Sequence, residues 1–452
     1  MKSYQVHPNI SLVSPILNQA PFLEATIQSV LNQEYPNLEY LIIDGGSTDG
    51  TLEIIKKYEP QLTYWESQQD NGQAHAINKG WQRATGEIVG WLNSDDLLYP
   101  GALEKVGRFF AQNPNVDFIH GHCIQFDDQR GDWVEPKDFT PTSELDPYKL
   151  KLDYLAGFPY GQPACFFRKR VLDQIGMLDE DYFFTMDYDL FIRIALNFKM
   201  QRIDDILAKF RVHPASKSAN YQHIRIKERN KAFSKLVRTI IALEEGQPAT
   251  SHELPATTQP PNSQKPNTPI PQYANTTQQP NDQHPNTPIR QYANTPTPHP
   301  PNHPTPNTQQ PIPPSPQPPN HPIRQRANTP PHPHPYLHLL KSLNLYHEST
   351  DTYPIINCQY SQEEFRDVVA NFLWIKAFEH HKHLRIAESK PLFKALGKFA
   401  PDFLKRYDNQ HLYLKNRWLN KPLIESFRNA RFMMQKLLKT KFKSILFFKT
   451  FY

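Results

Sequence analysis

The segment GEIVGWLNSDD (residues 86–96) decides the fold, because a short apolar run leads directly into a polar turn with two acidic side chains. The apolar run predicts a buried β-strand over 87–92. Asp95 and Asp96 follow at its carboxyl end. Ligands of open α/β sheets bind beyond the carboxyl ends of the strands, so we expect the acidic pair on the ligand-binding edge.

Strands and helices alternate on both sides of this segment. The alternation predicts an α/β fold with a doubly wound, mostly parallel sheet that is covered on both faces. A helix is also expected within 181–198, where acidic residues precede an apolar run. The other strands are expected over 10–14, 40–43, 62–65 and 118–122, and the other helices over 22–31, 51–58, 73–84 and from Pro100 to Asn113.

Proline divides the chain into three parts, since well over half of its 44 prolines fall between residues 246 and 335. This stretch is rich in Asn, Thr, Gln and His and almost free of aliphatic residues, so it cannot repay the entropy of ordering. Its related segments, such as PNTPIPQYANT and PNTPIRQYANT, indicate a duplicated linker. We therefore expect a catalytic domain over 1–245, a disordered repeat linker over 246–335 and a basic, mainly helical region over 336–452.

The C-terminal region carries about twenty Lys and Arg against about ten Asp and Glu, and it ends in KFKSILFFKTFY. This pattern predicts peripheral contact with anionic lipid at the inner face of the plasma membrane, with a solvated or packed helical surface as the alternative. The three cysteines lack CxxC spacing, and no apolar stretch is long enough to span a bilayer. We expect a cytoplasmic protein without a nucleic-acid partner.

Four acidic residues, at three places in the sequence, match the demands of sugar transfer from a nucleotide diphosphate. Asp95 and Asp96 suit a divalent cation that neutralises the diphosphate, or alternatively a turn cap. Asp44, in IIDGGSTDG (residues 42–50), suits nucleotide recognition or a tight turn. Asp187 suits a general base or a helix first-turn acid. Neither GxGxxG nor GxxxxGK[ST] occurs, which argues against dinucleotide-dependent hydride transfer and P-loop chemistry.

The order of these pieces resembles family 2 glycosyltransferases of the GT-A fold, which are inverting enzymes that use nucleotide-activated sugars. The resemblance covers about residues 8–218. It rests on SLVSPILNQAPFLEATIQSVLNQEYPNLEYLIIDGGSTDG, DNGQAHAINKGWQRATGEIVGWLNSDDLLYPGAL, GQPACFFRKRVLDQIGMLDEDYFFTMDYDLFIRIAL and FRVHPASKS.

The resemblance implies a role for each candidate residue. Asp187 is implied as the general base. Asp96 and His213 are implied as ligands of Mn²⁺ or Mg²⁺. The residues implied to bind the nucleotide-sugar donor are Pro15, Asp44, Asn78, Asp95 and Arg211.

The sequence departs from the family pattern at two places. Gly45 stands where many members carry a second Asp, which affects the contact to the base. Met186 stands where a Glu usually precedes the general base, so Asp189 is an alternative to Asp187.

The resulting functional prediction is an inverting glycosyltransferase for polysaccharide or cell-envelope synthesis. It moves one sugar from a nucleotide-diphosphate sugar to a glycan or lipid-linked acceptor. The QxxRW element of processive polymerising members is absent, which favours transfer of a single sugar. The alternative is a catalytically inactive GT-A-like scaffold that acts through the linker and the basic tail, as Gly45 and Met186 suggest.

Overall fold

The computed structural model describes residues 7–129, 131–132, 141–157, 161–246, 334–349, 351–382 and 385–406. All of them fall within one compact unit of the chain. Nearly all of the predicted linker lies outside the described residues. So does the apolar, basic end of the chain that the sequence assigns to membrane contact.

The described strands form one nine-stranded mixed sheet in the order β3-β2-β1-β4-β8-β6-β9-β5, with β7 paired to β6. The first four strands in this order are parallel, as the alternation of strands and helices predicts. β8 runs antiparallel to both of its neighbours. The strands are β1 Ile10–Ile16, β2 Leu38–Asp44, β3 Tyr64–Ser67, β4 Ile88–Trp91, β5 Leu97–Leu98, β6 Phe118–Asp127, β7 Gly131–Asp132, β8 Cys165–Arg168 and β9 Met200–Arg211.

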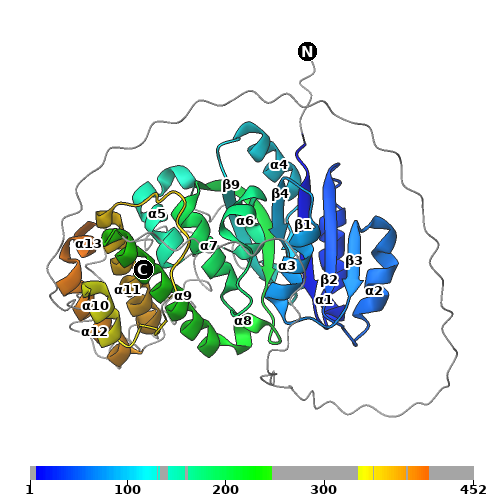
Figure 1. Cartoon of the computed structure of the whole chain (residues 1–452). Coiled ribbons are helices and arrows are strands. Elements are labelled where there is room, and N and C mark those ends of the chain that lie inside the picture. Colours follow the sequence, from blue (N-terminus) through cyan, green and yellow to red (C-terminus); the bar gives the residue numbers. More distant parts are fainter. Residues whose placement is uncertain are drawn as a thin grey trace, which may run out of the picture. The chain divides into compact units, whose positions relative to one another are not determined.

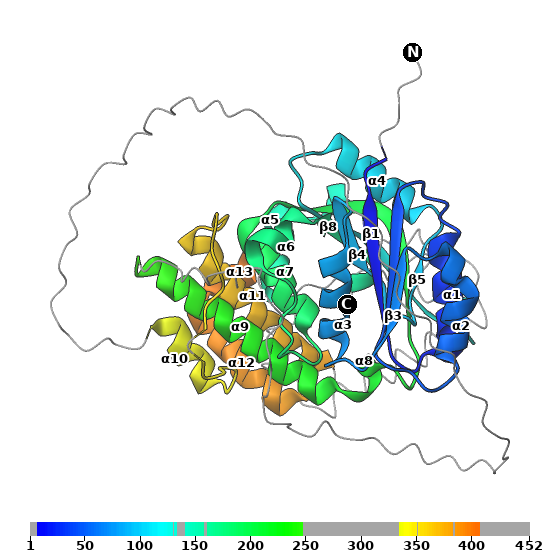
Figure 2. The ribbon, with the colours of Figure 1, turned by 45° about the vertical axis from the view of Figure 1, so that its right-hand side comes forward.

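Helices cover both faces of the sheet, with α1, α2 and α4 on one face and α3 and α7 on the other (Figures 1 and 2). The helices of the first part of the chain are α1 Ala20–Leu31, α2 Thr51–Tyr58, α3 Gln73–Arg83, α4 Ala102–Gln112, α5 Pro147–Ala156, α6 Arg170–Ile175, α7 Met186–Asn197, α8 Lys217–Asn220 and α9 Gln222–Glu244. Those beyond residue 333 are α10 Pro335–Ser342, α11 Gln362–Lys382, α12 Ile386–Phe399 and α13 Pro401–Arg406.

Alternating side chains of the central strands supply the two apolar cores. Along β2, Tyr40 and Ile42 join the core that contains residues of α1, α2 and α4. Leu41 and Ile43 join the core that contains residues of α3 and α7. Successive side chains of a strand point to opposite faces, so one buried strand serves both cores.

The helices beyond residue 333 share the second core with α5, α7 and α9. The rings of Phe233 on α9 and Phe372 on α11 stack with centroids 3.6 Å apart. The hydroxyl of Tyr353 donates to Asp189 on α7 at 2.9 Å. Among the described residues, α10 to α13 agree with the mainly helical C-terminal region that the sequence predicts. No helix of the described residues is long and apolar enough to cross a bilayer.

Candidate functional site

The loops after β1 and β2 lie at one edge of the sheet and are joined by hydrogen bonds. The backbone N–H of Asn18 donates to the Ser47 hydroxyl at 2.7 Å, and the Asn18 side-chain oxygen accepts from the N–H of Thr48 at 2.9 Å. Asn18 adopts a left-handed conformation with φ of 52°. Pro15, predicted in the first nucleotide-binding loop, lies inside β1 and is buried.

Asp44, the last residue of β2, organises the turn that follows it. Its Oδ2 accepts from the N–H groups of Gly46 and Ser47 at 3.1 and 3.0 Å and from the Ser67 hydroxyl at 2.6 Å. Its Oδ1 accepts from the Ser47 hydroxyl. The side chain is fully buried, so a ligand at this turn meets the backbone that Asp44 holds rather than its carboxylate.

Asp70 occupies the space that a side chain at Gly45 would need. A Cβ atom on Gly45 would lie 2.8 Å from Oδ2 of Asp70. The other oxygen, Oδ1, accepts from the N–H of Gly72 at 2.8 Å. Burial raises the pKa of Asp70, and the nearby Asp44 raises it further. A carboxylate from another loop therefore stands beside the position where related sequences carry a second Asp.

Asp95 and Asp96 face in different directions. Oδ1 of Asp96 accepts from the N–H of Arg211 at 3.0 Å, and its Oδ2 accepts from the Asn93 side chain at 3.1 Å. Asp96 is fully buried, and burial together with the charge of Asp95 raises its pKa well above the ordinary value. The structure thus turns Asp96, predicted as a metal ligand, into the interior, where it joins β9 to the end of β4.

The carboxylate of Asp95 faces His213 instead. Its Oδ2 lies 3.1 Å from Nε2 of His213, and the two side chains are 22% and 11% exposed. The ring of Phe22 packs against His213 with centroids 4.4 Å apart. This pair therefore presents one oxygen and one nitrogen at the surface of the ligand-binding edge.

Arg211, predicted at the donor diphosphate, is 4% exposed, and its guanidinium is already engaged. Its Nε donates to the backbone oxygen of Asp95 at 2.8 Å, and Nη1 pairs with Asp128. The guanidinium also lies over the rings of Phe22 and Phe126, at 5.1 and 4.6 Å. Arg211 consequently fixes the backbone of the acidic turn.

Asn78, also predicted to bind the donor, connects α3 to the segment before α7. Its Nδ2 donates to the backbone oxygen of Leu178 and to Glu180, both at 2.9 Å. Its Oδ1 accepts from the N–H of Leu178 at 3.0 Å. The side chain is 5% exposed, so Asn78 positions protein segments and offers no free group to a donor.

Asp187 lies in the first turn of α7 and is partly buried. One oxygen, Oδ1, accepts from the N–H of Tyr188 at 2.7 Å. Burial raises its pKa, while Arg229 and Lys217 oppose that shift. A carboxylate whose pKa lies above the usual range is suited to accept a proton near neutral pH.

Asp189, the alternative to Asp187, is fully buried. Its Oδ2 pairs with Arg193 at 3.0 Å, and its Oδ1 accepts from the hydroxyl of Tyr353 at 2.9 Å. Both oxygens therefore bind the protein interior, which leaves Asp187 as the carboxylate available at the head of α7.

A bridge of side chains joins the α7 region to the end of β4. Lys217 donates to Oε1 of Gln73 at 2.8 Å, and Nε2 of Gln73 donates to Asn93 at 2.8 Å. Lys217 also donates to the backbone oxygen of Phe183 at 2.7 Å. Burial lowers the pKa of Lys217 to about 8. The predicted base and the acidic turn are therefore parts of one connected site.

Among the described residues, no cluster of three or more His, Cys, Asp or Glu side chains could hold a metal ion alone. Asp95 and His213 supply two adjacent ligand atoms. Magnesium sites commonly use one or two protein ligands and complete the coordination with water and substrate phosphates. The residues present fit a cation that is held jointly by the protein and a diphosphate.

Comparison with known families covers the part of the chain that holds the nucleotide turn and the acidic turn. Residues 11–176 match the family model described as glycosyl transferase family 2. The N-terminal part of the chain is a family 2 glycosyltransferase domain.

Individual relatives are also named as glycosyltransferases. An uncharacterized glycosyltransferase of Rickettsia typhi is 29% identical over 220 residues, which make up 48% of this chain and 67% of the relative. The putative teichuronic acid biosynthesis glycosyltransferase TuaG of Bacillus subtilis is 34% identical over 126 residues, 27% of this chain and 49% of that protein. The match to the relatives from Rickettsia felis and Rickettsia conorii spans only about a third of the length of those proteins.

Solved structures that resemble part of this chain include a mannosyltransferase and a protein in complex with UDP. The mannosyltransferase PcManGT from Pyrobaculum calidifontis, in complex with GDP-Man and Mn²⁺, is 21% identical, with a TM-score of 0.40 and coverage of 52% of this chain and 65% of that one. TarS of S. aureus, residues 1–349 in complex with UDP, is 18% identical, with a TM-score of 0.38 and coverage of 50% and 64%.

Several residues of the candidate site carry no signal in the sequence. Gln73 and Lys217 lie inside the motifs that carry the family resemblance, but neither residue type indicates a bridge between them. Asp128 lies in no recognised motif and becomes visible only as the partner of Arg211. Nothing in the sequence links Asp70 to Gly45, and only the structure shows that its carboxylate lies beside Gly45.

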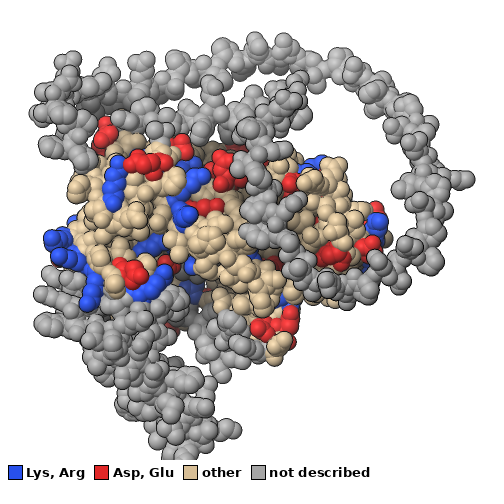
Figure 3. Space-filling model, turned by 90° about the horizontal axis from the view of Figure 1, so that it is seen from below, with Lys and Arg blue, Asp and Glu red and all other residues tan. Residues whose placement is uncertain are grey.

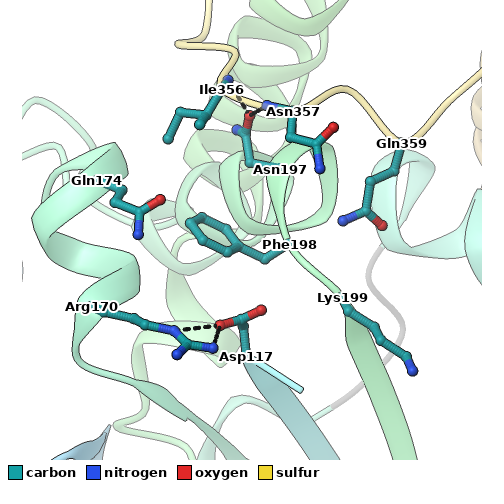
Figure 4. Close-up of a pocket in the computed structure, with 9 residues that line it drawn as sticks. All are labelled: Asp117, Arg170, Gln174, Asn197, Phe198, Lys199, Ile356, Asn357 and Gln359. Carbon is teal, nitrogen blue, oxygen red and sulfur yellow. Dashed lines mark hydrogen bonds and ion pairs between the residues drawn. The ribbon is translucent and has the colours of Figure 1, made fainter. Parts of the chain in front are cut away.

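A hollow of about 460 Å³ lies at the opposite edge of the sheet, at the amino ends of β6 and β9 (Figure 4). Arg170 and Asp117 form an ion pair at one end, and the ring of Phe198 lies between them and Asn197 (Figure 4). Lys199 and Gln359 lie on another side (Figure 4). Because this hollow lies at the edge away from the acidic turn, it is separate from the candidate glycosyltransferase site.

Proposed function

We propose that the chain catalyses inverting transfer of a single sugar from a nucleotide-diphosphate sugar to a glycan or lipid-linked acceptor. The observation that carries the proposal is the bridge from Lys217 through Gln73 to Asn93, which joins the region of Asp187 to the acidic turn. Transfer needs a charge-neutralising group at the leaving diphosphate and a base at the acceptor, and one site offers both.

Asp95 and His213 are proposed as the ligands of Mn²⁺ or Mg²⁺. Support comes from their mutual orientation and from their exposure at the site, in contrast to the burial of Asp96. When bound, the cation acts as a Lewis acid that stabilises the charge developing on the diphosphate. The protein's own contribution is to hold the Asp95 backbone through Arg211.

Asp187 is proposed as the general base that takes the proton from the acceptor hydroxyl. Its raised pKa supports this role, as does its second oxygen, which makes no hydrogen bond to another residue of the described ranges. Burial raises the pKa of Asp187, and the neighbouring cations Arg229 and Lys217 oppose that rise. Asp189 is engaged by Arg193 and Tyr353, which favours Asp187.

Asp70 is proposed to replace the missing second Asp of the nucleotide turn. Support comes from its Oδ2, which lies where a side chain on Gly45 would extend. With Oδ1 held by Gly72, the second oxygen is oriented toward the turn and can accept from a donor base or ribose. Asp44 would act indirectly by fixing the same turn.

A panel of nucleotide-sugars tests the function. We expect one donor to raise the melting temperature only in the presence of Mn²⁺ or Mg²⁺, since a ligand that binds only the native state stabilises it. With that donor and an accepted glycan, proton NMR of the product should show an inverted anomeric centre. Metal-independent binding, no donor binding, or retention would contradict the proposal, and the first two would favour a catalytically inactive scaffold.

We further propose peripheral attachment at the inner face of the plasma membrane, through the basic region beyond residue 406. The support is compositional: this stretch combines Lys and Arg with an apolar end. Liposome sedimentation of the full chain and of a chain ending at residue 406 tests it. Equal sedimentation of the two with anionic vesicles would contradict the proposal.

A further inference from the structure

Basic side chains gather on the part of the fold that contains the C-terminal helices. On the face drawn in Figure 3, most Lys and Arg side chains of the described residues lie on the side of α10 to α13. A smaller group is partly enclosed between α9, α11 and the start of α12. We call it the basic cluster, and it consists of Arg225, Arg229, Lys376 and Arg385.

The basic cluster has too few counter-charges. Nη1 of Arg229 lies 3.2 Å from Oε1 of Glu379, and Nζ of Lys376 lies 3.9 Å from the other oxygen of the same carboxylate. The side chains of Arg225 and Arg385 make no hydrogen bond or ion pair within the part of the chain that the structure describes, and their Nε atoms are buried. Glu379 thus serves both Arg229 and Lys376, and neither Arg225 nor Arg385 forms an ion pair with a described carboxylate.

This arrangement is unfavourable for the folded chain alone. Lys376 is only 3% exposed. Burial and the charges of Arg229, Arg225 and Arg385 lower its pKa to about 7. Burial also lowers the pKa of Arg225. A buried charge without a full counter-charge destabilises the folded state strongly. An anion bound among these side chains would therefore raise the free energy of unfolding.

The basic cluster begins beside the proposed general base. The guanidinium of Arg229 lies 5.3 Å from the ring centre of Tyr188, the residue after Asp187. Arg229 and Arg225, four positions apart on α9, both interact electrostatically with Asp187. Lys217 acts on Asp187 from the other direction and leads through Gln73 to the acidic turn. The cluster therefore extends from Asp187 toward the C-terminal helices.

We propose that the basic cluster binds a phosphate group of the acceptor, close to the hydroxyl that receives the sugar. The location next to the acceptor rests on the proposed function, in which Asp187 marks the position of that hydroxyl. Arginine binds phosphate through two parallel hydrogen bonds, and Lys376 adds a point charge. The phosphate belongs either to a lipid-linked acceptor or to a water-soluble phosphorylated glycan.

Inorganic phosphate is the first probe, used with the full chain without divalent cation or donor. We expect phosphate to raise the melting temperature of the wild type more than sodium chloride does at equal ionic strength. In Arg225→Met/Lys376→Met we expect a higher melting temperature without phosphate, because repulsion is relieved, and at least a tenfold weaker phosphate affinity by calorimetry. Lys227→Met, at an exposed position of α9, is the matched control and should bind phosphate as the wild type does.

Vesicles distinguish the two sources of phosphate. If the acceptor is lipid-linked, phosphatidylcholine vesicles with a polyprenyl phosphate should sediment more of the Lys227→Met control than of the double variant, since both keep the basic region beyond residue 406 and differ only in the cluster. If it is soluble, the two should sediment equally while the difference in phosphate affinity remains.

The proposal is overturned if phosphate stabilises the wild type no more than chloride does, or if the double variant binds phosphate as tightly as the wild type. The latter result would place the anion elsewhere, for instance at the donor site. Lys376→Met alone provides the same comparison if the double variant does not fold. Since these assays contain neither donor nor metal, their failure is distinct from a failure of the proposed sugar transfer.

Discussion

The two adjacent carboxylates at the end of β4 have different environments and therefore different proposed roles. Asp96 binds the backbone of Arg211 and is buried, whereas Asp95 faces His213 at the surface of the site. The sequence places both residues at the correct edge of the sheet. It does not show which carboxylate turns inward, because that depends on contacts with Arg211, more than 100 positions away.

The pH dependence of transfer tests the role of Asp187. A base must be ionised, and burial raises the pKa of Asp187, so the rate should fall with decreasing pH at a higher pH than for an exposed aspartate, whose pKa is about 3.9. Asp187→Asn should lower kcat by about 10²–10⁴-fold, a typical contribution of general base catalysis. Steady-state kinetics across pH measures both. An unchanged rate in Asp187→Asn would exclude this role, and Asp189→Asn with a selective loss of kcat would reassign it.

The contact between Gly45 and Asp70 can be tested by a double-mutant cycle. The added methyl of Gly45→Ala displaces the Asp70 carboxylate, since its Cβ would lie 2.8 Å from Oδ2. We expect Gly45→Ala and Asp70→Ala each to weaken donor binding. The double variant should bind no more weakly than Asp70→Ala alone, because the two changes act through the same carboxylate. Calorimetry measures the affinities, and additive losses would show that Asp70 is not the group affected.

At the scale of elements, the first four strands and their helices follow directly from apolar periodicity. Beyond β6 the sequence was less informative, and β8, β9, α5 and α9 were not predicted. β8 has only four residues, and β9 contains two adjacent acidic residues, Asp204 and Asp205, that interrupt any apolar pattern. These strands are specified by their partners in the sheet, which local sequence does not reveal.

The loop before α7 is held by a single carboxylate on α9. Glu228 accepts from the N–H groups of Phe183, Phe184 and Thr185, each at 2.8 Å. Because this loop leads into the turn that carries Asp187, Glu228→Gln should lower kcat about tenfold, as expected for a misplaced base, with little effect on the KM for the donor. Steady-state kinetics with Lys227→Gln as the control tests it. Equal changes in kcat for the two variants would contradict a positioning role.

At the scale of the whole molecule, the helices beyond residue 333 complete the core of the glycosyltransferase unit. Composition divides the chain at its proline-rich stretch but does not show that the parts on either side of it pack together. The contacts that join them, such as Phe233 with Phe372 and Asp189 with Tyr353, connect positions more than 130 residues apart. Apolar periodicity identifies the buried face of a helix but not the surface that it covers.

This shared core predicts the effect of a substitution in the C-terminal helices. Phe372→Ala should lower the free energy of unfolding by about 3–5 kcal/mol, the usual range for a fully buried phenylalanine. Phe378→Ala, on the same helix but 43% exposed, is the matched control and should have a much smaller effect. Urea denaturation followed by fluorescence measures both. A small loss in Phe372→Ala would mean that the C-terminal helices are not part of the same cooperative unit.

Asp95 and His213 are proposed to hold the divalent cation, while Asp96 supports the fold. The most direct test of this assignment is Mn²⁺ binding, followed by electron paramagnetic resonance in the presence of the accepted nucleotide-sugar. Removal of a group that only orients a metal ligand typically lowers the metal affinity about tenfold or more. Removal of a ligand itself should lower the Mn²⁺ affinity at least as much. We predict such a loss in Asp95→Asn and in His213→Ala, with Asp96→Asn close to the wild type. Wild-type affinity in Asp95→Asn, with a loss only in Asp96→Asn, would contradict the account.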